Sequence, residues 1–463
     1  MGIMTHKTHL TIEEIQRIGR TALGKKMKDI IGNDFEDKLK HKGQLGHLIE
    51  EFLFKQKPHN DAEADFKEAG VELKVTPIKK LKNGLFSSKE RIVLNMIDYK
   101  KENVDNFELS SFWKKNKRLY IMFYEYMRGL PKSEYKIYDE LMHVFSDQDL
   151  IQIKKDWEII ATKIKNGQAH LISESDTLYL SACTKGIDGS KTRPQRNNNL
   201  EAKGRAYALK SSYVTGQLRK LKEKNIYSIT KGTSQDLESY IKERIKPYEN
   251  KELNELFSLL NINSKAKNVN EQIITAILCY KGKKLSNAEE FIKGNIRFKT
   301  ILLDNKLNLK ESMSFENFKF DEIIEENWEE STLRDYFLTT KFAFSVFKGT
   351  KTNPIFIGVK FWNMQEDTID TELKQVWDKT VQIIKEGRVY QDTNSNISNF
   401  PKLKDNKVCH VRPKGKNAKD VYILPIADEK TGKTYYTKQC FWLNASYIKN
   451  IVLELFDLNN HTD

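Results

Sequence analysis

The sequence contains no apolar run that could cross a membrane. No stretch of its 463 residues approaches the roughly 18–20 uninterrupted apolar residues that a membrane-spanning helix needs. The start of the chain, where Lys7, Glu13 and Arg17 are closely spaced, lacks the apolar core of a signal peptide. We therefore expect a cytoplasmic protein with no membrane partner.

Cysteine and histidine are too scattered for the common zinc sites. The four cysteines include no C-x-x-C pair, and the nine histidines show no H-x-x-x-H spacing. A reducing cytoplasm keeps such cysteines as thiols. These absences argue against a disulfide scaffold, a zinc ribbon and a zinc hydrolase that binds its metal through histidines.

Basic residues outnumber acidic ones. The chain has 78 Lys and Arg against 64 Asp and Glu, which gives a formal net charge of +14. Such an excess favours a polyanionic partner, because each phosphate neutralised by Lys or Arg releases condensed counterions. Solvated charged faces produce the same excess, so charge alone leaves both interpretations open.

Helical and strand-like patterns alternate along the chain. Apolar residues recur at helical spacing from Lys42 to Phe54, and Asp149–Lys165 also has the pattern of a helix. Gly70–Val75 alternates apolar and charged residues, Ile92–Ile97 is nearly continuous apolar, and Leu119–Tyr126 is rich in aromatics, all typical of strands. The mixture predicts an α/β fold with a mixed sheet covered by helices.

The two halves of the chain resemble each other. At roughly 100–200 residues per domain, the length predicts two or three domains, and a Lys-rich stretch followed by Ser, Thr and Gly predicts a linker at residues 223–233. Segments on either side match in the same order, which predicts a duplicated domain. The matching pairs are 157–167 with 377–387, 183–186 with 412–415, 205–214 with 439–448, and 108–123 with 330–347.

The segment that points most directly to chemistry is the D-x6-E-x-K pattern of Asp65, Glu72 and Lys74. Period-two alternation puts Glu72 and Lys74 on one face of a strand, and Asp65, just ahead of Gly70, would fold back so that both carboxylates share a hard divalent cation. Mg²⁺ suits such oxygen ligands and keeps water molecules, one of which can attack a phosphodiester. Lys74 would orient or deprotonate that water, or offset charge on the phosphorus. The alternative is a half-exposed strand with solvated charges.

Further motifs surround this triplet. They are Lys42-Gly-Gln-Leu-Gly46 followed by Glu50, Gly70-Val-Glu-Leu-Lys-Val-Thr-Pro77, Ser88-Lys-Glu-Arg91 and Asn106-Phe-Glu-Leu-Ser-Ser111. Together they resemble the MutH-type branch of the restriction-endonuclease-like superfamily, and nearly the whole chain resembles its larger, duplicated Sau-type restriction enzymes, which cut at GATC. The resemblance implies two tandem MutH-like domains, each a mixed β-sheet flanked by helices. Residues 1–222 would be catalytic, and residues 234–463 would be a degenerate effector domain that binds DNA.

The resemblance also implies roles for residues of the first half. Asp65, Glu72 and Lys74 would form the catalytic triad, with Asp65 and Glu72 holding Mg²⁺. Glu50 is either an accessory acid near the metal or a solvated helix carboxylate. Lys115 is either a further active-site lysine or a surface lysine.

The DNA-reading segment of the family is a V-R-P-K-like strand followed by an aromatic-rich one. The nearest match is Val411-Arg-Pro-Lys414 in the second half, which makes Arg412 and Lys414 candidates for the effector site. Arg412 is the sharper candidate for a base contact, because arginine reads guanine through two hydrogen bonds in the major groove. The first half has Cys183-Thr-Lys185 instead. Its candidates, each equally a phosphate contact or a solvated surface residue, are Lys185, Arg205, Tyr207 and Lys210.

The second half departs from the catalytic pattern. The aligned pairs are Lys299 with Lys74, Arg297 with Glu72, Glu290 with Asp65, and Ala276 with Glu50. Arginine cannot bind Mg²⁺, so the second copy should bind DNA without cutting it.

We therefore expect a type II, specifically type IIE, restriction endonuclease of a bacterial cell, making Mg²⁺-dependent double-strand cuts at unmodified GATC sites. The second copy would bind another site and loop the DNA, and a cognate DNA methyltransferase would protect the host. The alternatives are a MutH-like mismatch-repair nicking enzyme and a non-catalytic DNA-binding regulator. The sequence leaves open the cut position, the methylation that blocks cutting, and whether the enzyme is a monomer or a DNA-induced dimer.

Overall fold

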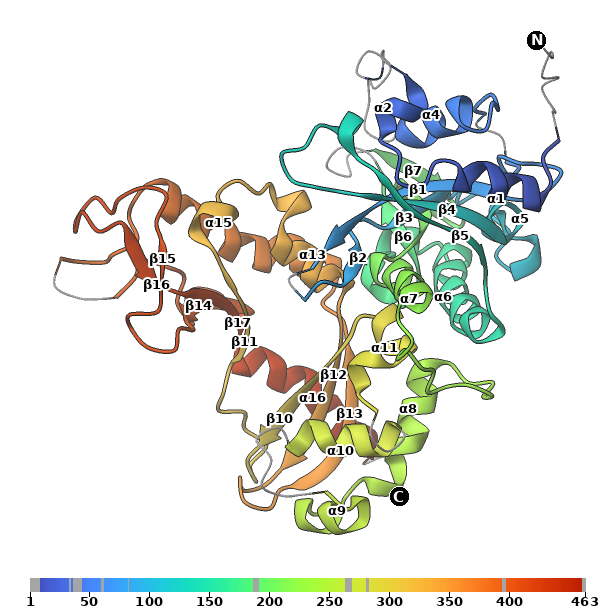
Figure 1. Ribbon diagram of the computed structural model, residues 1–463. Helices are drawn as coiled ribbons and strands as arrows, with labels where there is room; N and C mark the ends of the chain where they lie inside the picture. Colours follow the sequence, from blue (N-terminus) through green and yellow to red (C-terminus); the bar gives the residue numbers. More distant parts are fainter. Residues whose placement is uncertain are drawn as a thin grey trace. The chain divides into compact units, whose positions relative to one another are not determined.

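The computed structural model divides the chain into two compact units (Figure 1). Unit 1 comprises Met1–Leu237 and Ser286–Asn295, and unit 2 comprises Glu238–Leu285 and Ile296–Asp463. The structure describes residues 9–32, 35, 44–59, 62–81, 83–185, 191–262, 269–279, 283–393 and 397–459. Within those ranges, none of the helices combines the length and apolarity that crossing a membrane requires.

Unit 1 contains a mixed four-stranded sheet in the order β2-β1-β4-β5. Strands β1 (Glu72–Lys80) and β4 (Arg118–Glu125) run parallel, whereas β2 (Phe86–Ser88) and β5 (Ile137–Val144) pair antiparallel with them. Strand β4 is an inner strand of this sheet, and its five consecutive residues Leu119–Phe123 are buried, so it is covered on both faces. Helices on one face supply apolar partners such as Ile15 and Ile49.

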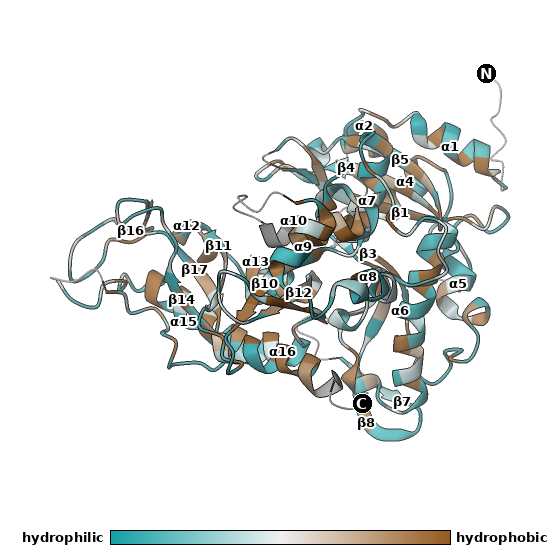
Figure 2. Ribbon diagram, turned by 90° about the horizontal axis from the view of Figure 1, so that it is seen from below, coloured by the Kyte–Doolittle hydropathy of each residue, from teal (hydrophilic) through white to brown (hydrophobic). Residues whose placement is uncertain are grey.

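The helices of unit 1 carry the polar and apolar alternation expected of surface helices. Figure 2 shows it along α1, where teal and brown follow each other around the turns. Residues 42 and 43 of the predicted first-half helix lie outside the described residues. The bounds are α1 (Ile12–Arg20), α2 (Met27–Ile31), α4 (Gln44–Phe52), α5 (Ser111–Asn116), α6 (Asp147–Lys165), α7 (Ser211–Lys222) and α11 (Glu289–Lys293).

A second, antiparallel sheet of unit 1 has the order β3-β9-β6, formed by β3 (Ile92–Met96), β9 (Arg205–Leu209) and β6 (Leu180–Thr184). The buried carboxylate of Asp156 on α6 accepts hydrogen bonds from the backbone N–H groups of Leu178, Tyr179 and Leu180, at 2.9, 2.6 and 2.9 Å. These hydrogen bonds hold the backbone at the start of β6 against α6. A separate ribbon pairs β7 (Thr192–Gln195) with β8 (Asn198–Lys203).

Unit 2 also contains two main sheets. The first has the order β10-β12-β13, with β10 (Ile296–Leu303) parallel to β12 (Lys341–Lys348) and β13 (Ile355–Trp362) antiparallel. The second has the order β11-β17-β14, formed by β11 (Met313–Phe318), β17 (Gln439–Leu443) and β14 (Cys409–Pro413). Strands β15 (Val421–Ile423) and β16 (Tyr435–Thr437) form a ribbon.

Helices α12, α13, α15 and α16 of unit 2 pack apolar side chains into one hydrophobic core. Figure 2 shows the alternating sides of α16, which follows the last strand. The bounds are α8 (Leu237–Ile245), α9 (Leu253–Leu260), α10 (Val269–Leu278), α12 (Phe320–Ile323), α13 (Thr332–Thr339), α14 (Glu366–Thr368), α15 (Lys374–Lys385) and α16 (Ala445–Asn459).

The two units share one order of strands. The arrangement β1-β4-β5 corresponds to β10-β12-β13, and β3-β9-β6 corresponds to β11-β17-β14. In each unit a helix follows the middle strand of the second sheet, α7 after β9 and α16 after β17. The predicted fold class, a mixed sheet flanked by helices, is confirmed.

The chain returns to unit 1 after its first passage through unit 2. Helix α11 packs on α7, and Figure 1 shows the yellow α11 beside the green α7. The carboxylate of Glu290 accepts hydrogen bonds from the hydroxyl of Ser228 and from the backbone N–H groups of Ile229 and Thr230. Glu290 is the residue that the alignment pairs with Asp65. It is buried in unit 1, where its carboxylate binds residues 228–230 of the predicted linker.

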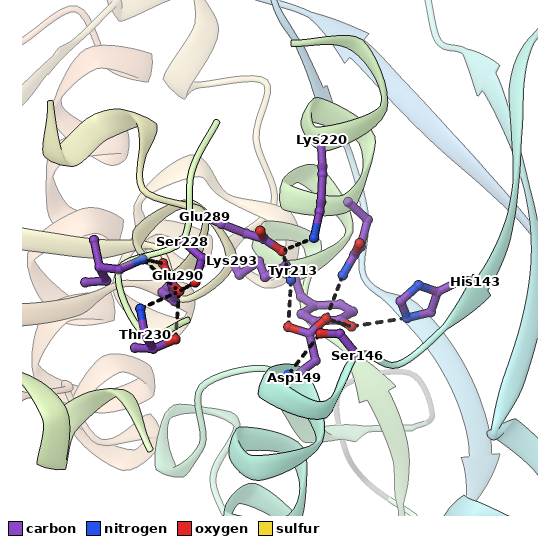
Figure 3. A network of polar contacts seen from close by, with 12 residues as sticks. His143, Ser146, Asp149, Tyr213, Lys220, Ser228, Thr230, Glu289, Glu290 and Lys293 are labelled. Carbon is purple, nitrogen blue, oxygen red and sulfur yellow. Dashed lines mark hydrogen bonds and ion pairs between the residues drawn. The ribbon is translucent and has the colours of Figure 1, made fainter. Parts of the chain in front are cut away.

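Next to this anchor lies a buried network of charged side chains, which Figure 3 shows in close-up. Lys293 is 1% exposed, and its Nζ lies 2.6 Å from Asp149 Oδ1 and also contacts Glu289. The hydroxyl of Tyr213 donates to Asp149 Oδ2 and lies 3.1 Å from His143 Nε2. The network ties α11 to α6, α7 and β5.

Candidate active site

A short turn folds Asp65 back onto the first residue of β1. Phe66 and Val71 exchange backbone hydrogen bonds of 2.9 and 3.2 Å across the turn. Gly70 closes it with a φ of 59°, in the left-handed region that favours glycine. The backbone N–H of Asp65 then donates to Glu72 Oε2 at 3.2 Å. The structure thus brings these two residues together.

Two lysines surround the carboxylate of Glu72. Lys74 Nζ lies 2.8 Å from Glu72 Oε1, and Lys115 Nζ lies 3.7 Å from the same oxygen. Lys115 lies on α5, which begins after the N-cap Ser110 and leads directly into β4, the parallel neighbour of β1. The side chain of Glu72 is buried, so both ion pairs act where water screens them little. Lys115 belongs to this cluster rather than to the open surface.

Glu50 completes the group from α4. Its side chain is 3% exposed, and within the described part of the structure its Oε1 has no hydrogen-bond partner. Burial, together with the charges of Asp65 and Glu72, raises the pKa of Glu50 to about 8 even though Lys115 and Lys74 oppose the shift. A solvated helix carboxylate would show none of these properties, so Glu50 lies within the cluster.

The cluster holds more carboxylates than its lysines balance. Burial and the charge of Glu72 raise the pKa of Asp65, although Lys74 and a 2.8 Å hydrogen bond from the Leu73 N–H to Asp65 Oδ2 work in the opposite direction. With all groups ionised, three carboxylates face two ammonium groups. A divalent cation would relieve this repulsion, and the oxygen donors are of the kind that Mg²⁺ prefers.

Metal binding would require a small rearrangement. Among the described residues, no group of three or more His, Cys, Asp or Glu side chains is already arranged around a metal position. Lys74 Nζ lies 2.8 Å from Glu72 Oε1, one of the two carboxylate oxygens available to an ion. The residues therefore fit a divalent cation in chemical type, provided that Lys74 moves away from Glu72.

The structure places the predicted DNA-contacting residues of unit 1 in two environments. Lys185, at the end of β6, is half-buried. Arg205, Tyr207 and Lys210 are buried, with Tyr207 at 0% exposure and the Arg205 Nη1 donating to the carbonyl of Ala182 at 2.8 Å. Arg205 and Tyr207 lie on β9, whose five residues are all buried, and Lys210 Nζ donates to the carbonyl oxygen of Thr177. That these three side chains contact DNA stays a prediction.

In unit 2, the predicted effector residues lie exposed on and just after β14. The guanidinium carbon of Arg412 lies 5.1 Å from the centre of the Trp442 ring on β17. Lys414 Nζ donates to the carbonyl oxygen of Phe315 on β11. The sequence analysis did not single out Trp442, although the aromatic character of the second strand was a signal for it.

Acidic residues stand beside lysine at the start of a strand in a mixed sheet, an arrangement that suits a nuclease. The family model described as DNA mismatch repair enzyme MutH matches residues 54–156, which include Asp65, Glu72, Lys74 and Lys115. The chain is 37% identical over 491 residues to the type II restriction enzyme Sau3AI of Staphylococcus aureus, covering 97% of this chain and 100% of that enzyme. The chain therefore belongs to the MutH-like type II restriction endonucleases. It is a nuclease that acts on DNA.

Proposed function

We propose that unit 1 hydrolyses DNA with a Mg²⁺ ion held by Asp65 and Glu72. The observation that carries the proposal is the buried convergence of these carboxylates with Glu50, whose pKa is raised to about 8 by burial and by the charges of Asp65 and Glu72. When bound, Mg²⁺ supplies an activated water and stabilises negative charge on the reacting phosphate. The oxygen-rich site matches this cation in chemical type.

The side chains around the metal ligands take distinct parts in this proposal. Lys74, released from Glu72, contacts the attacking water or the scissile phosphate and stabilises the charge that develops there. Lys115 stays beside Glu72 and offsets its negative charge. Glu50 would serve as an accessory carboxylate near the metal, where a bound cation would offset the negative charges around it.

The proposed substrate is unmodified duplex DNA containing GATC. Support comes from the likeness of the first-half motifs to the Sau-type enzymes and from the net charge of +14. Among the proposed DNA contacts of unit 1, Lys185 is the one that is not fully buried. A cognate methyltransferase protecting the host genome, and a bacterial cytoplasm as the place of action, belong to the same proposal.

Unit 2 is proposed to be a duplicated, degenerate copy that binds a second GATC site as an allosteric effector. The shared strand order supports duplication, and exposed Arg412 and Lys414 support DNA binding. The corresponding domains are residues 1–222 and 234–463, joined by 223–233, with residues 286–295 docked on the catalytic one. Two occupied sites on one DNA would form a loop, with the enzyme acting as a monomer or a DNA-induced dimer.

A plasmid digest separates the candidate functions. Purified protein is incubated with unmethylated plasmid, with and without Mg²⁺, and the ends are mapped. Double-strand fragments ending at GATC only in Mg²⁺ support the proposal. Nicked circles alone would favour a mismatch-repair type of enzyme, and a mobility shift without cleavage would favour a DNA-binding regulator.

The effector role needs its own comparison. Plasmids with one GATC site should be cut more slowly than plasmids with two, and a short duplex containing the sequence should restore the rate in trans. The stimulation reflects a coupling free energy between the two DNA sites, typically about 1–3 kcal/mol. Equal rates on both plasmids, unaffected by the duplex, would contradict the effector role.

A further inference from the structure

Strand β10 carries cations at the positions where β1 carries its catalytic residues. Both strands run parallel to the central strand of their sheet. The residues that pair across these strands are Glu72 with Leu119, Lys74 with Ile121, Arg297 with Phe342, and Lys299 with Phe344. Leu119 and Phe342 are each the second residue of their strand, so Arg297 stands at the place of Glu72 and Lys299 at that of Lys74.

A third cation comes from the other sheet of unit 2. Phe315 lies at a bulge of β11 between Ser314 and Asn317, and its ring centre lies 6.1 Å from that of Phe342 on β12 in the other sheet. Lys414 Nζ donates to the carbonyl oxygen of Phe315, and Lys299 Nζ lies 6.0 Å from the centre of its ring. Lys299 of β10 and Lys414, which follows β14, therefore both lie next to Phe315.

Among the charged neighbours of Lys299, one acidic group, Glu316, faces two cations, Lys414 and Arg297. In the part of the chain that the structure describes, none of Arg297, Lys299 and Lys414 forms an ion pair. Burial and the like charges of Lys414 and Arg297 lower the pKa of Lys299, and Glu316 opposes the shift only in part. Arg297 and Lys414 are exposed, so the positive charge is open to solvent. Such a group is stabilised by an anion that binds between its members.

We propose that Arg297, Lys299 and Lys414 form a site for a DNA backbone phosphodiester that needs no metal ion. This rests on the proposed DNA binding by unit 2 and names the chemistry that achieves it. The planar guanidinium of Arg297 matches two phosphate oxygens, and the two ammonium groups contribute compact charges. Arg412, two residues before Lys414 and exposed like it, is the further cation in this proposal that would reach the bases.

The two units then differ in their need for metal. In unit 1, buried carboxylates repel the phosphate until a divalent cation neutralises them. In unit 2, the same place in the fold attracts the phosphate directly. DNA binding by the full-length chain in EDTA should therefore depend mainly on unit 2.

The test is fluorescence anisotropy of a labelled GATC duplex with the full-length protein, in EDTA and in Ca²⁺. The double variant Arg297→Gln/Lys299→Gln should bind about tenfold more weakly in EDTA, with the slope of log affinity against log salt reduced by about 1, because the contact to one phosphate is lost. In Ca²⁺ the loss should be smaller, since unit 1 then binds as well.

The matched control is Lys306→Gln/Lys310→Gln, which removes the same charge from exposed positions beyond the other end of β10. It should change affinity less than about threefold. Arg297→Gln alone, at an exposed position, serves if the double variant fails to fold, and Arg297→Lys should recover part of the binding. Unchanged binding of the double variant in EDTA, or an equal loss in the control, would overturn the inference.

The outcome is separable from that of the proposed nuclease function. A protein that cuts plasmid in Mg²⁺ but binds no DNA in EDTA contradicts this inference alone. A protein whose EDTA binding depends on Arg297 and Lys299 but that never cuts DNA supports the inference and contradicts the proposed catalysis by unit 1.

Discussion

Replacing Lys293 with methionine should destabilise unit 1 substantially. Lys293 Nζ lies 2.6 Å from Asp149 Oδ1 and also pairs with Glu289, and the lysine side chain is almost fully buried (Figure 3). Lys293→Met keeps the aliphatic stem, which passes so close to Gly216 that a Cβ added there would lie 2.4 Å from Lys293 Cγ. The substitution thus removes the charge while preserving the packing.

The expected loss follows from the charges left behind. Removing one partner of a buried ion pair costs about 3–5 kcal/mol. Lys293 holds the pKa of Asp149 below its ordinary value although burial acts to raise it. Without the lysine, burial should raise that pKa above the unfolded value, so the folded variant gains stability from protonation at low pH. The free energy lost should therefore be larger at pH 8 than at pH 5.

Urea unfolding, with hydrogen exchange to locate the change on α6, α7 and α11, measures this loss. The control is a double-mutant cycle with Asp149→Asn, in which Asp149→Asn/Lys293→Met should lose less than the sum of the two single variants. A loss below about 1 kcal/mol for Lys293→Met, or strict additivity in the cycle, would refute the reasoning.

Three further predictions concern unit 1. Burial lowers the pKa of His143 to about 4. Unit 1 should therefore lose about 3 kcal/mol of stability as the pH falls from about 6.5 to about 4. Urea titrations of His143→Gln should lack this pH dependence, and an unchanged pH profile would contradict the prediction. Gly70→Ala should strain the turn before β1 by about 1 kcal/mol. It should slow cleavage more than Gly70→Asn does, because asparagine tolerates a positive φ. Equal cleavage rates for the two variants would count against a role of this turn in the site. Lys185→Ala should reduce the salt slope of DNA binding in Ca²⁺ by about 1, and an unaltered slope would remove Lys185 from the interface.

The cluster proposed to be catalytic could be predicted from the sequence in part. The spacing of Asp65, Glu72 and Lys74 was enough to predict that they come together, because a turn closed by glycine and a strand are both local structures. Glu50 and Lys115 stayed ambiguous, because α4 and α5 reach the site only through tertiary packing. Their burial beside Glu72 appears only in the folded unit.

Local sequence patterns did not reveal that predicted DNA-contacting side chains are buried, or where residues at the edge of a domain dock. Strand alternation predicts two faces but not whether both are covered, and β9 turned out to be buried throughout, including Arg205 and Tyr207. The alignment paired Arg297 with Glu72 in agreement with the strand register, yet it also paired Glu290 with Asp65. Glu290 instead docks on residues 228–230, a long-range contact without a sequence signature.

The most direct test of the central claim compares Asp65→Asn and Glu72→Gln with Glu63→Gln in the Mg²⁺ plasmid digest. Glu63 is an exposed carboxylate close to Asp65 in sequence that pairs with Lys67 rather than with the cluster. The account predicts that Glu63→Gln cuts like the wild type, while the other two variants lose cleavage and still bind the GATC duplex in Ca²⁺ within a few fold. Cleavage by Asp65→Asn or Glu72→Gln at close to the wild-type rate would contradict it.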